Sequence, residues 1–380
     1  MKKIASGILC IGALLLSAAS EEVNGPGHEC TSWMIFSDLT GNNTNILHKN
    51  RDALSRDIVV VAGGNSSRRW IGLGNRRELP GCPCMGMNTS GLAAVVNGGE
   101  LTPENSADQN WNGRTTPQLL KDILDNCDTA AQAVERLRGF IAAKDYSHRK
   151  EGSIFLFTDV NEGYIVELTA GFVSAQRVDR GYALRANTWH NPGMAQRSCN
   201  IWLEFSGSFV REHAVISNFH KAIYQNGRLG LVDSLAMSRN CEDPKEAQIE
   251  RRVCYTYTNS GSTLVIDREY PDVLSVGYVT IGHPRHTICV PIPICVEKLD
   301  KRMEDTAWSK AAWARFEKLG LRAPIPKEWL DFEEKSRVEY DACLVEARKL
   351  LRAGRKTEAI ALLNAAAAKI WQGAAELLEL

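Results

Sequence analysis

Short apolar segments of two kinds, gathered into blocks, constrain the fold of this chain more than any other feature. Segments with the length and residue content of buried strands lie at 31–36, 45–49, 58–62, 92–96, 153–157, 164–168, 182–185, 263–266 and 275–281. Segments with helical spacing follow Pro117 and occupy 129–143, 208–225, 344–352 and 357–371. Because blocks of strands are separated from blocks of helices, the pattern predicts an α+β layered domain rather than repeated strand–helix–strand units.

Residues 1–20 have the organisation of a secretory signal peptide. Lys2 and Lys3 form a basic start, Ile8 to Leu16 form an apolar segment, and Ala18-Ala19-Ser20 supplies small residues for cleavage. The apolar segment is shorter than the roughly 20 residues that span a bilayer. We therefore expect a secreted or periplasmic protein with no membrane span once the signal is removed, and an uncleaved anchor is the alternative.

The charge balance and the cysteines narrow the class of partner. Lysine and arginine number 45, as do aspartate and glutamate, so nothing favours a nucleic acid over a small-molecule substrate. The sequence leaves a homo-oligomer open. Ten of the eleven cysteines follow the signal peptide, and an exported protein can form disulfides from them. Cys82-x-Cys84 fits no standard zinc spacing, so we expect no metal and no cofactor, with a metal site there as a minor alternative.

Cys30 has an unusual position for a core residue. It stands between a polar, Gly/Pro-containing stretch at 21–29 (EEVNGPGHE), which we expect to be a propeptide, and the strand at 31–36. Cleavage after Glu29 would give Cys30 a free α-amine, whose ordinary pKa is about 8. That amine can take the proton of the thiol, so nucleophile and base would reside on one residue. The alternative is a buried or disulfide-bonded cysteine.

Polar residues at strand ends could serve such a nucleophile. Lys49-Asn50-Arg51-Asp52 ends the second strand, and a carboxylate there could hold the amine or thiol of Cys30. Asn97 follows a buried strand and precedes two glycines, where its amide or backbone N–H could meet an oxyanion. Asn187 follows the strand at 182–185 in a similar way. Each of these polar groups taken alone also suits an ordinary turn.

Taken in order, these residues resemble a known family. Cys30-Thr31, Asn50-x-Asp52, the turn GMNxxGL at 86–92 followed by Asn97, and Asn187-Thr188 resemble the N-terminal-nucleophile hydrolases with cysteine nucleophiles. Choloylglycine hydrolases, penicillin V acylases and acyl-CoA:6-aminopenicillanic acid acyltransferases belong to this family. Further similar segments are GYIVE at 163–167, SFVR at 208–211 and VGYVTIGHP at 276–284. The resemblance covers roughly residues 30 to 295.

The resemblance implies a role for each matching residue. Cys30 would be the nucleophile and its α-amine the base, and Asp52 would orient them. Asn97 would line the oxyanion hole. Asn187 would support the amine and the tetrahedral intermediate, and Arg211 would lie near the active site.

The resemblance also implies the architecture and the reaction. The fold would be a four-layer αββα sandwich over residues 30–300, with a C-terminal helical extension at 301–380. The reaction would be hydrolysis of a non-peptide linear C–N amide bond in a small acylated amine, through a thioester at Cys30. The alternatives are an acyltransferase on the same scaffold and a non-catalytic, exported, disulfide-containing binding protein.

One position departs from the family pattern. The choloylglycine hydrolases have Arg-Asn-x-Asp where this chain has Lys49-Asn50-Arg51-Asp52, and lysine keeps the charge but loses the planar fork of arginine. We expect Arg51 to point the other way along the strand, and so not to replace that arginine. Lys49, Asn50 and Arg51 are the residues that we expect to contact substrate.

Overall fold

The structure is a computed structural model that describes residues 30–77, 79–104, 106–147, 151–199, 207–241 and 252–380. The signal peptide and propeptide predicted at 1–20 and 21–29 lie outside these residues. Among the described residues, no helix combines the length and apolar character that a membrane span needs.

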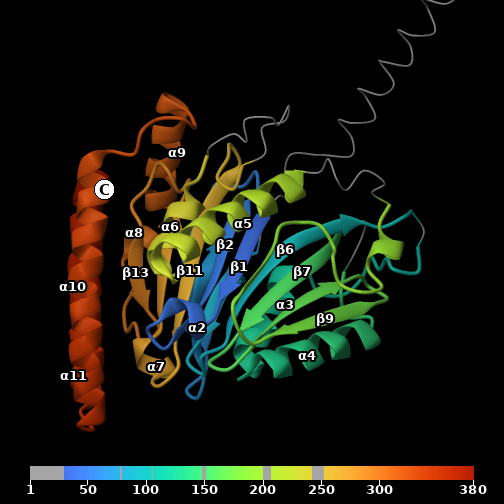
Figure 1. The fold of residues 1–380 in the computed structure, drawn as a ribbon, viewed down its shortest axis with the longest axis horizontal. Helices are drawn as coiled ribbons and strands as arrows, with labels where there is room; N and C mark the ends of the chain where they lie inside the picture. Colours follow the sequence, from blue (N-terminus) through green and yellow to red (C-terminus); the bar gives the residue numbers. More distant parts are fainter. Residues whose placement is uncertain (1–29, 78, 105, 148–150, 200–206, 242–251) are drawn as a thin grey trace, which may run out of the picture.

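Two sheets, in which every strand pairs antiparallel to its neighbours, form the centre of the fold (Figure 1). The first sheet has the order β10-β1-β2-β11-β12-β13 and the second runs in chain order from β3 to β9. The strands of the first sheet are β1 (Cys30–Ile35), β2 (Thr44–Asp52), β10 (Tyr182–Arg185), β11 (Thr258–Asp267), β12 (Val276–Ile281) and β13 (Val290–Pro293). Those of the second are β3 (Ile58–Gly64), β4 (Arg69–Asn75), β5 (Pro83–Asn88), β6 (Ala93–Leu101), β7 (Glu151–Thr158), β8 (Gly163–Leu168) and β9 (Val173–Val178).

Helices α3 (Thr116–Asn126) and α4 (Ala130–Ala142) cover the outer face of the second sheet (Figure 1). Helix α3 begins where the sequence predicts, because Thr115 and Gln118 form a reciprocal capping box. Its leucines and isoleucine are buried with Phe155 and Phe157 of β7 in an apolar cluster between these helices and the second sheet.

A further set of helices packs against the first sheet. These helices are α5 (Gly207–Asn226), α6 (Leu231–Ser238), α9 (Ala307–Leu319), α10 (Lys327–Arg352) and α11 (Lys356–Leu377), whereas the short helix α8 (Lys301–Glu304) contacts α9 and β3 of the second sheet. The short elements α2 (Ser37–Thr40), α7 (Pro271–Leu274) and η1 (Ala195–Arg197) lie in connections. Helix, sheet, sheet and helix therefore stack in this order, and the predicted αββα sandwich is confirmed.

The C-terminal helices share the core of the sandwich. α10 and α11 form an antiparallel hairpin that stands beside β13 (Figure 1), and Trp371 Nε1 donates a 2.7 Å hydrogen bond to the Pro291 carbonyl. Trp308 and Tyr340 are fully buried and belong to the same apolar cluster as the strands of the first sheet. Residues 301–380 are therefore helical, and their apolar side chains are continuous with the main core.

The segment 86–92 differs from its prediction as a turn. Residues 83–88 form β5, a central strand of the second sheet, and the turn begins only at Thr89. Gly86 is part of the ladder because the neighbouring strand approaches closely: a Cβ there would lie 2.6 Å from the Ile71 carbonyl oxygen. Glycine in this position marks close strand packing rather than a chain reversal.

Candidate active site

Cys30 opens β1 and lies opposite Arg51 of β2. Two residues further along β1, Ser32 lies opposite Lys49 of β2. Residues paired across two antiparallel strands have their side chains on the same face of the sheet. Cys30, Ser32, Lys49 and Arg51 therefore lie on one face. The expectation that Arg51 points away from Lys49 is wrong, because side chains two residues apart in a strand point to the same side.

Asn187 joins β1 to the second sheet and to α5. Its side-chain oxygen accepts a 2.8 Å hydrogen bond from the backbone nitrogen of Cys30. Its Nδ2 donates to the Gly98 carbonyl at 2.9 Å, and its backbone N–H donates to Ser208 Oγ at 3.3 Å. Asn187 follows β10, which pairs with β1, so the sheet itself brings this residue to the start of β1.

Arg211 shares the acceptor that holds Cys30. It is fully buried on α5, and its Nη2 donates to Asn187 Oδ1 at 2.7 Å. Its Nε donates to Thr31 Oγ1 at 3.1 Å. One amide oxygen thus receives both the nitrogen of Cys30 and a guanidinium, and the structure brings Cys30, Asn187 and Arg211 together at one point.

Asn97 and Lys49 form a polar link between the two sheets. Asn97 Oδ1 accepts from Lys49 Nζ at 2.9 Å and from Ser32 Oγ at 2.8 Å. Asn97 Nδ2 donates to the carbonyls of Arg185 and Ala186 at 3.1 and 2.9 Å. Both amide hydrogens of Asn97 are therefore already donated, and one of these bonds would have to break before this side chain could reach an oxyanion.

Lys49 is buried in this link. Its side chain is 1% exposed, and its ammonium also donates a 2.6 Å hydrogen bond to the Val96 carbonyl. The partners found for this ammonium are neutral oxygens. Contact between Lys49 and a substrate remains a prediction.

Asn50 lies on the face of β2 opposite to Lys49, and its side chain binds the backbone of Ser238 and Val253. Its Nδ2 donates to the carbonyls of Ser238 and Val253 at 2.8 and 2.9 Å, and its Oδ1 accepts from Ser238 Oγ. His48 Nε2 lies 3.0 Å from the same oxygen, so it must carry the proton there. These contacts anchor residues 238 and 253 to β2, and a role for Asn50 in substrate contact remains a prediction.

His48 is a buried neutral imidazole. It stacks on Trp33 with ring centroids 3.9 Å apart, and its Nδ1 lies 2.7 Å from Thr263 Oγ1. Burial is the main cause that lowers the pKa of His48 to about 3, and the charge of Lys49 acts in the same direction.

Asp52 ends β2, one residue beyond the partner of Cys30, and pairs with Thr258 of β11. Its side chain is 1% exposed. Burial, and after it the charge of Asp52, raises the pKa of the Cys254 thiol, so the carboxylate of Asp52 lies within electrostatic range of that residue. Its role in orienting Cys30 remains a prediction.

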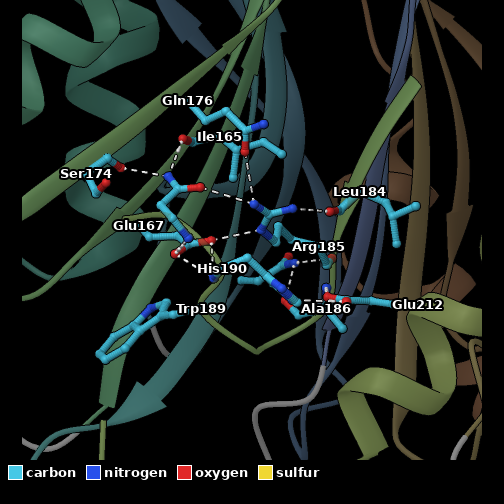
Figure 2. Close-up of polar contacts among 12 residues, drawn as sticks. Ile165, Glu167, Ser174, Gln176, Leu184, Arg185, Ala186, Trp189, His190 and Glu212 are labelled. Carbon is cyan, nitrogen blue, oxygen red and sulfur yellow. Dashed lines mark hydrogen bonds and ion pairs between the residues drawn. The ribbon is translucent and has the colours of Figure 1, made fainter. Parts of the chain in front are cut away.

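Two buried carboxylates that the sequence analysis did not select hold the segment around Asn187 (Figure 2). Glu167 on β8 accepts from the backbone N–H of His190 at 3.0 and 2.9 Å and from Arg185 Nε at 2.8 Å. Glu212 on α5 accepts from the Ala186 N–H at 2.8 Å. Glu167 ends the motif GYIVE and Glu212 follows SFVR directly, so adjacency to these motifs was the available signal.

The state of the cysteines is relevant to the alternative of a disulfide-containing binding protein. All ten cysteines from Cys30 onward are free thiols in this structure. Within the described part of the chain, no group of three or more histidine, cysteine, aspartate or glutamate side chains could hold a metal ion. Two cavities of about 910 and 810 Å³ lie beside α6 and α10, and Tyr278 and Arg337 line both; Cys30, Asn187 and Arg211 line neither.

Comparisons with known proteins give structural neighbours only. No family model matches the chain, and no curated protein matches it. A variant of the conjugated bile acid hydrolase from Clostridium perfringens is 12% identical with a TM-score of 0.44, and a second mutant of it is 13% identical with a TM-score of 0.42. Each alignment covers 70% of this chain and 92% of the other.

Penicillin V acylase from Agrobacterium tumefaciens is 15% identical with a TM-score of 0.43, over 70% of this chain and 86% of that one. The assignment of the four-layer sandwich rests on the strand order and layers described above. The solved structures to which this chain is similar thus include a conjugated bile acid hydrolase and a penicillin V acylase, two of the three enzyme groups that its sequence motifs resemble.

Proposed function

We propose that this chain is an exported cysteine amidohydrolase that cleaves the linear C–N amide bond of a small acylated amine. The observation that carries the proposal is the contact of the Cys30 backbone nitrogen with Asn187 Oδ1, beside the buried guanidinium of Arg211. A nitrogen held by one side-chain acceptor at the first residue of a buried strand is well suited to become a free amine. The signal-like residues 1–20 support export.

Processing would create the catalytic group. The Cys30 thiol would attack the Glu29 carbonyl, the amide would pass to a thioester, and water would release residues 21–29. The nitrogen of Cys30 would then be a primary amine, still directed at Asn187 Oδ1. Because a second positive charge beside Arg211 is unfavourable, the guanidinium would keep this amine neutral and able to accept a proton.

Turnover would use the same groups. The amine takes the thiol proton as sulfur attacks the substrate carbonyl, and the proton then passes to the departing amine. The resulting Cys30 thioester is attacked by water, which the amine activates, and the acid leaves. Asp52 would orient the nucleophile, whereas Asn187 and Arg211 would stabilise the charge that develops in the tetrahedral intermediate.

An acyltransferase is the second candidate, because an acyl thioester can be resolved by an amine as well as by water. The two differ in what consumes the intermediate and not in how it forms. Addition of a primary amine should therefore divert product from acid to amide only in an acyltransferase.

The test is turnover on a panel of acylated amines, with released amine and released acid measured separately. The wild-type chain should release both in equal amounts, with a burst of amine where deacylation is slow. Asp52→Asn should fold and turn over more slowly, and Cys30→Ala should release nothing. Release of acid by Cys30→Ala at the wild-type rate would overturn the proposal.

A further inference from the structure

Two consecutive residues of helix α5 bind the segment that carries Asn187. Arg211 binds the side chain of Asn187. The next residue, Glu212, binds Ala186 and His190, which lie on either side of Asn187 in the chain (Figure 2). Glu212 Oε1 accepts the Ala186 N–H at 2.8 Å, and its Oε2 lies 3.1 Å from His190 Nε2. The contacts of Glu212 thus flank Asn187, one residue before it and three residues after it.

These contacts stabilise the buried carboxylate of Glu212. Its side chain is 9% exposed, and a carboxylate buried to this extent is costly unless it is hydrogen-bonded. A hydrogen bond from a backbone N–H to a carboxylate is roughly twice as strong as a neutral one. The helix therefore fixes the backbone at Ala186 and the ring of His190.

Carboxylates of the second sheet also bind this segment. Glu167 on β8 accepts the His190 N–H, and it pairs with Arg185 on β10. Glu100 on β6 accepts the Trp189 N–H at 3.0 Å. Glu167, Arg185 and Glu100 are thus charged side chains on three strands that bind this segment.

We propose that Glu212 is a positioning residue of the Cys30 site: through Ala186 and His190 it sets the place of Asn187, and through Asn187 the place of the Cys30 amine. This inference rests on the proposed function. Glu212 acts through the backbone and touches neither nucleophile nor substrate. Its loss should lower the rate of the chemical step rather than substrate binding, because a displacement of about 1 Å can cost about 100-fold in rate.

The experiment compares Glu212→Ala with Glu212→Gln. The glutamine keeps an oxygen for the Ala186 N–H, so kcat should stay within about threefold of wild type. The alanine removes both contacts, and kcat should fall about 10- to 100-fold with KM within about threefold. Rates are taken per folded protein, with melting temperatures measured alongside.

Asp159→Ala is the matched control. Asp159 is 2% exposed and its carboxylate accepts the backbone N–H groups of Ala130, Asn161 and Glu162, so its loss breaks bonds of the same kind away from Cys30. This variant should lose melting temperature yet keep kcat. If Glu212→Ala behaves like Asp159→Ala, or if Glu212→Gln is as slow as Glu212→Ala, the positioning role is overturned.

A second readout separates this inference from the proposed function. If wild type turns over no acylated amine, the proposed function fails, and the alkylation rate of the Cys30 thiol then tests Glu212. That rate should fall at least about fivefold in Glu212→Ala and stay unchanged in Asp159→Ala. An unchanged rate in Glu212→Ala would overturn the inference.

Discussion

The backbone nitrogen of Cys30 donates a 2.8 Å hydrogen bond to the side-chain oxygen of Asn187, which lies 157 residues further along the chain. Strand β10 makes this contact possible because it pairs with β1 and ends two residues before Asn187. Arg211 donates to the same oxygen at 2.7 Å.

Cys30→Ala should stop processing. Without the thiol no attack on the Glu29 carbonyl is possible, so the exported variant should accumulate as a species that begins near Glu21. Intact mass and N-terminal sequencing of the purified variant measure this. A Cys30→Ala protein that still begins at residue 30 would mean that another protease removes residues 21–29.

The variant Arg211→Lys keeps the positive charge at this position but loses the geometry of the two hydrogen bonds that the guanidinium donates. The guanidinium serves Asn187 Oδ1 and Thr31 Oγ1 with two nitrogens in a fixed fork, and a single ammonium cannot reproduce that arrangement. We expect kcat/KM to fall about 100-fold, or about 2.7 kcal/mol. Steady-state kinetics of Arg211→Lys and Arg211→Met measure the loss, and Arg211→Met within threefold of wild type would exclude a role for this residue.

Asn97→Ala should destabilise the fold as well as slow the enzyme. The side chain accepts from the buried Lys49 and donates to the two carbonyls before Asn187, so its removal leaves a buried cation and two acceptors poorly paired. We expect a loss on the order of 3 kcal/mol in the free energy of unfolding. Urea unfolding measures it.

The kinetics of the same variant test the oxyanion role. A loss of roughly 2.7–4 kcal/mol of transition-state stabilisation per folded molecule would indicate that Asn97 donates to the oxyanion. A kcat/KM within about threefold of wild type, corrected for folded fraction, would leave Asn97 with the structural role alone.

Acid should destabilise the protein through its buried histidines. Burial lowers the pKa of His48 to about 3 and that of His286 to about 4, and it also lowers the pKa of His283. The unfolded chain binds these protons near pH 6.5 and the folded chain does not, so the stability is complete above pH 6.5. It falls as the pH drops from 6.5 towards 3 or 4, by about 1.4 kcal/mol per pH unit for one histidine.

Urea unfolding at pH 7, 6 and 5 measures this dependence. His48→Gln can keep the contacts with Thr263 and Asn50, so it should be less stable than wild type at pH 7 but lose less stability on acidification. Equal pH dependence in the two proteins would show that His48 does not contribute.

Sequence patterns were sufficient for the elements whose apolar runs are unbroken. β1, β2, β3, β7, β8, β10 and β12 lie where short β-branched or aromatic runs predict them, and α3 begins at its capping box. Strands β4 (RWIGLGN) and β5 (PCMGMN) were not predicted, because their glycines suggest turns. In the structure Gly72 lets the two strands pack closely, since a Cβ there would lie 2.3 Å from the Met85 carbonyl oxygen.

Edge strands were missed for a different reason. β9 (VSAQRV) is partly exposed and polar, so it lacks the apolar run of a buried strand. β13 (VPIP) contains two prolines, which a strand tolerates at the edge of a sheet, and it ends the order of the first sheet. Position in the sheet, which follows from tertiary pairing, decides both cases.

Only the site residues that belong to a sequence motif could be predicted from the sequence. Cys30, Asn187 and Arg211 come from separate motifs, and the structure brings them together. Glu167 and Glu212 gave no separate signal, because a carboxylate becomes a buried acceptor only once its backbone partners are folded around it. The direction of Arg51 needed no structure and follows from the spacing of two along a strand.

The most direct test of the account is the intact mass of the mature exported protein, with and without a thiol-alkylating reagent. Burial raises the pKa of Cys127 to about 11 and that of Cys295 to about 12, and it raises those of Cys254 and Cys289 further, so these thiols should react slowly at neutral pH. The exposed Cys199 is the internal reference.

We predict a chain that begins at Cys30, whose thiol is the first to be alkylated and whose alkylation abolishes activity. A fully active protein that begins at Glu21, or active protein in which peptide mapping finds Cys30 in a disulfide, would contradict the assignment of Cys30 as an N-terminal nucleophile.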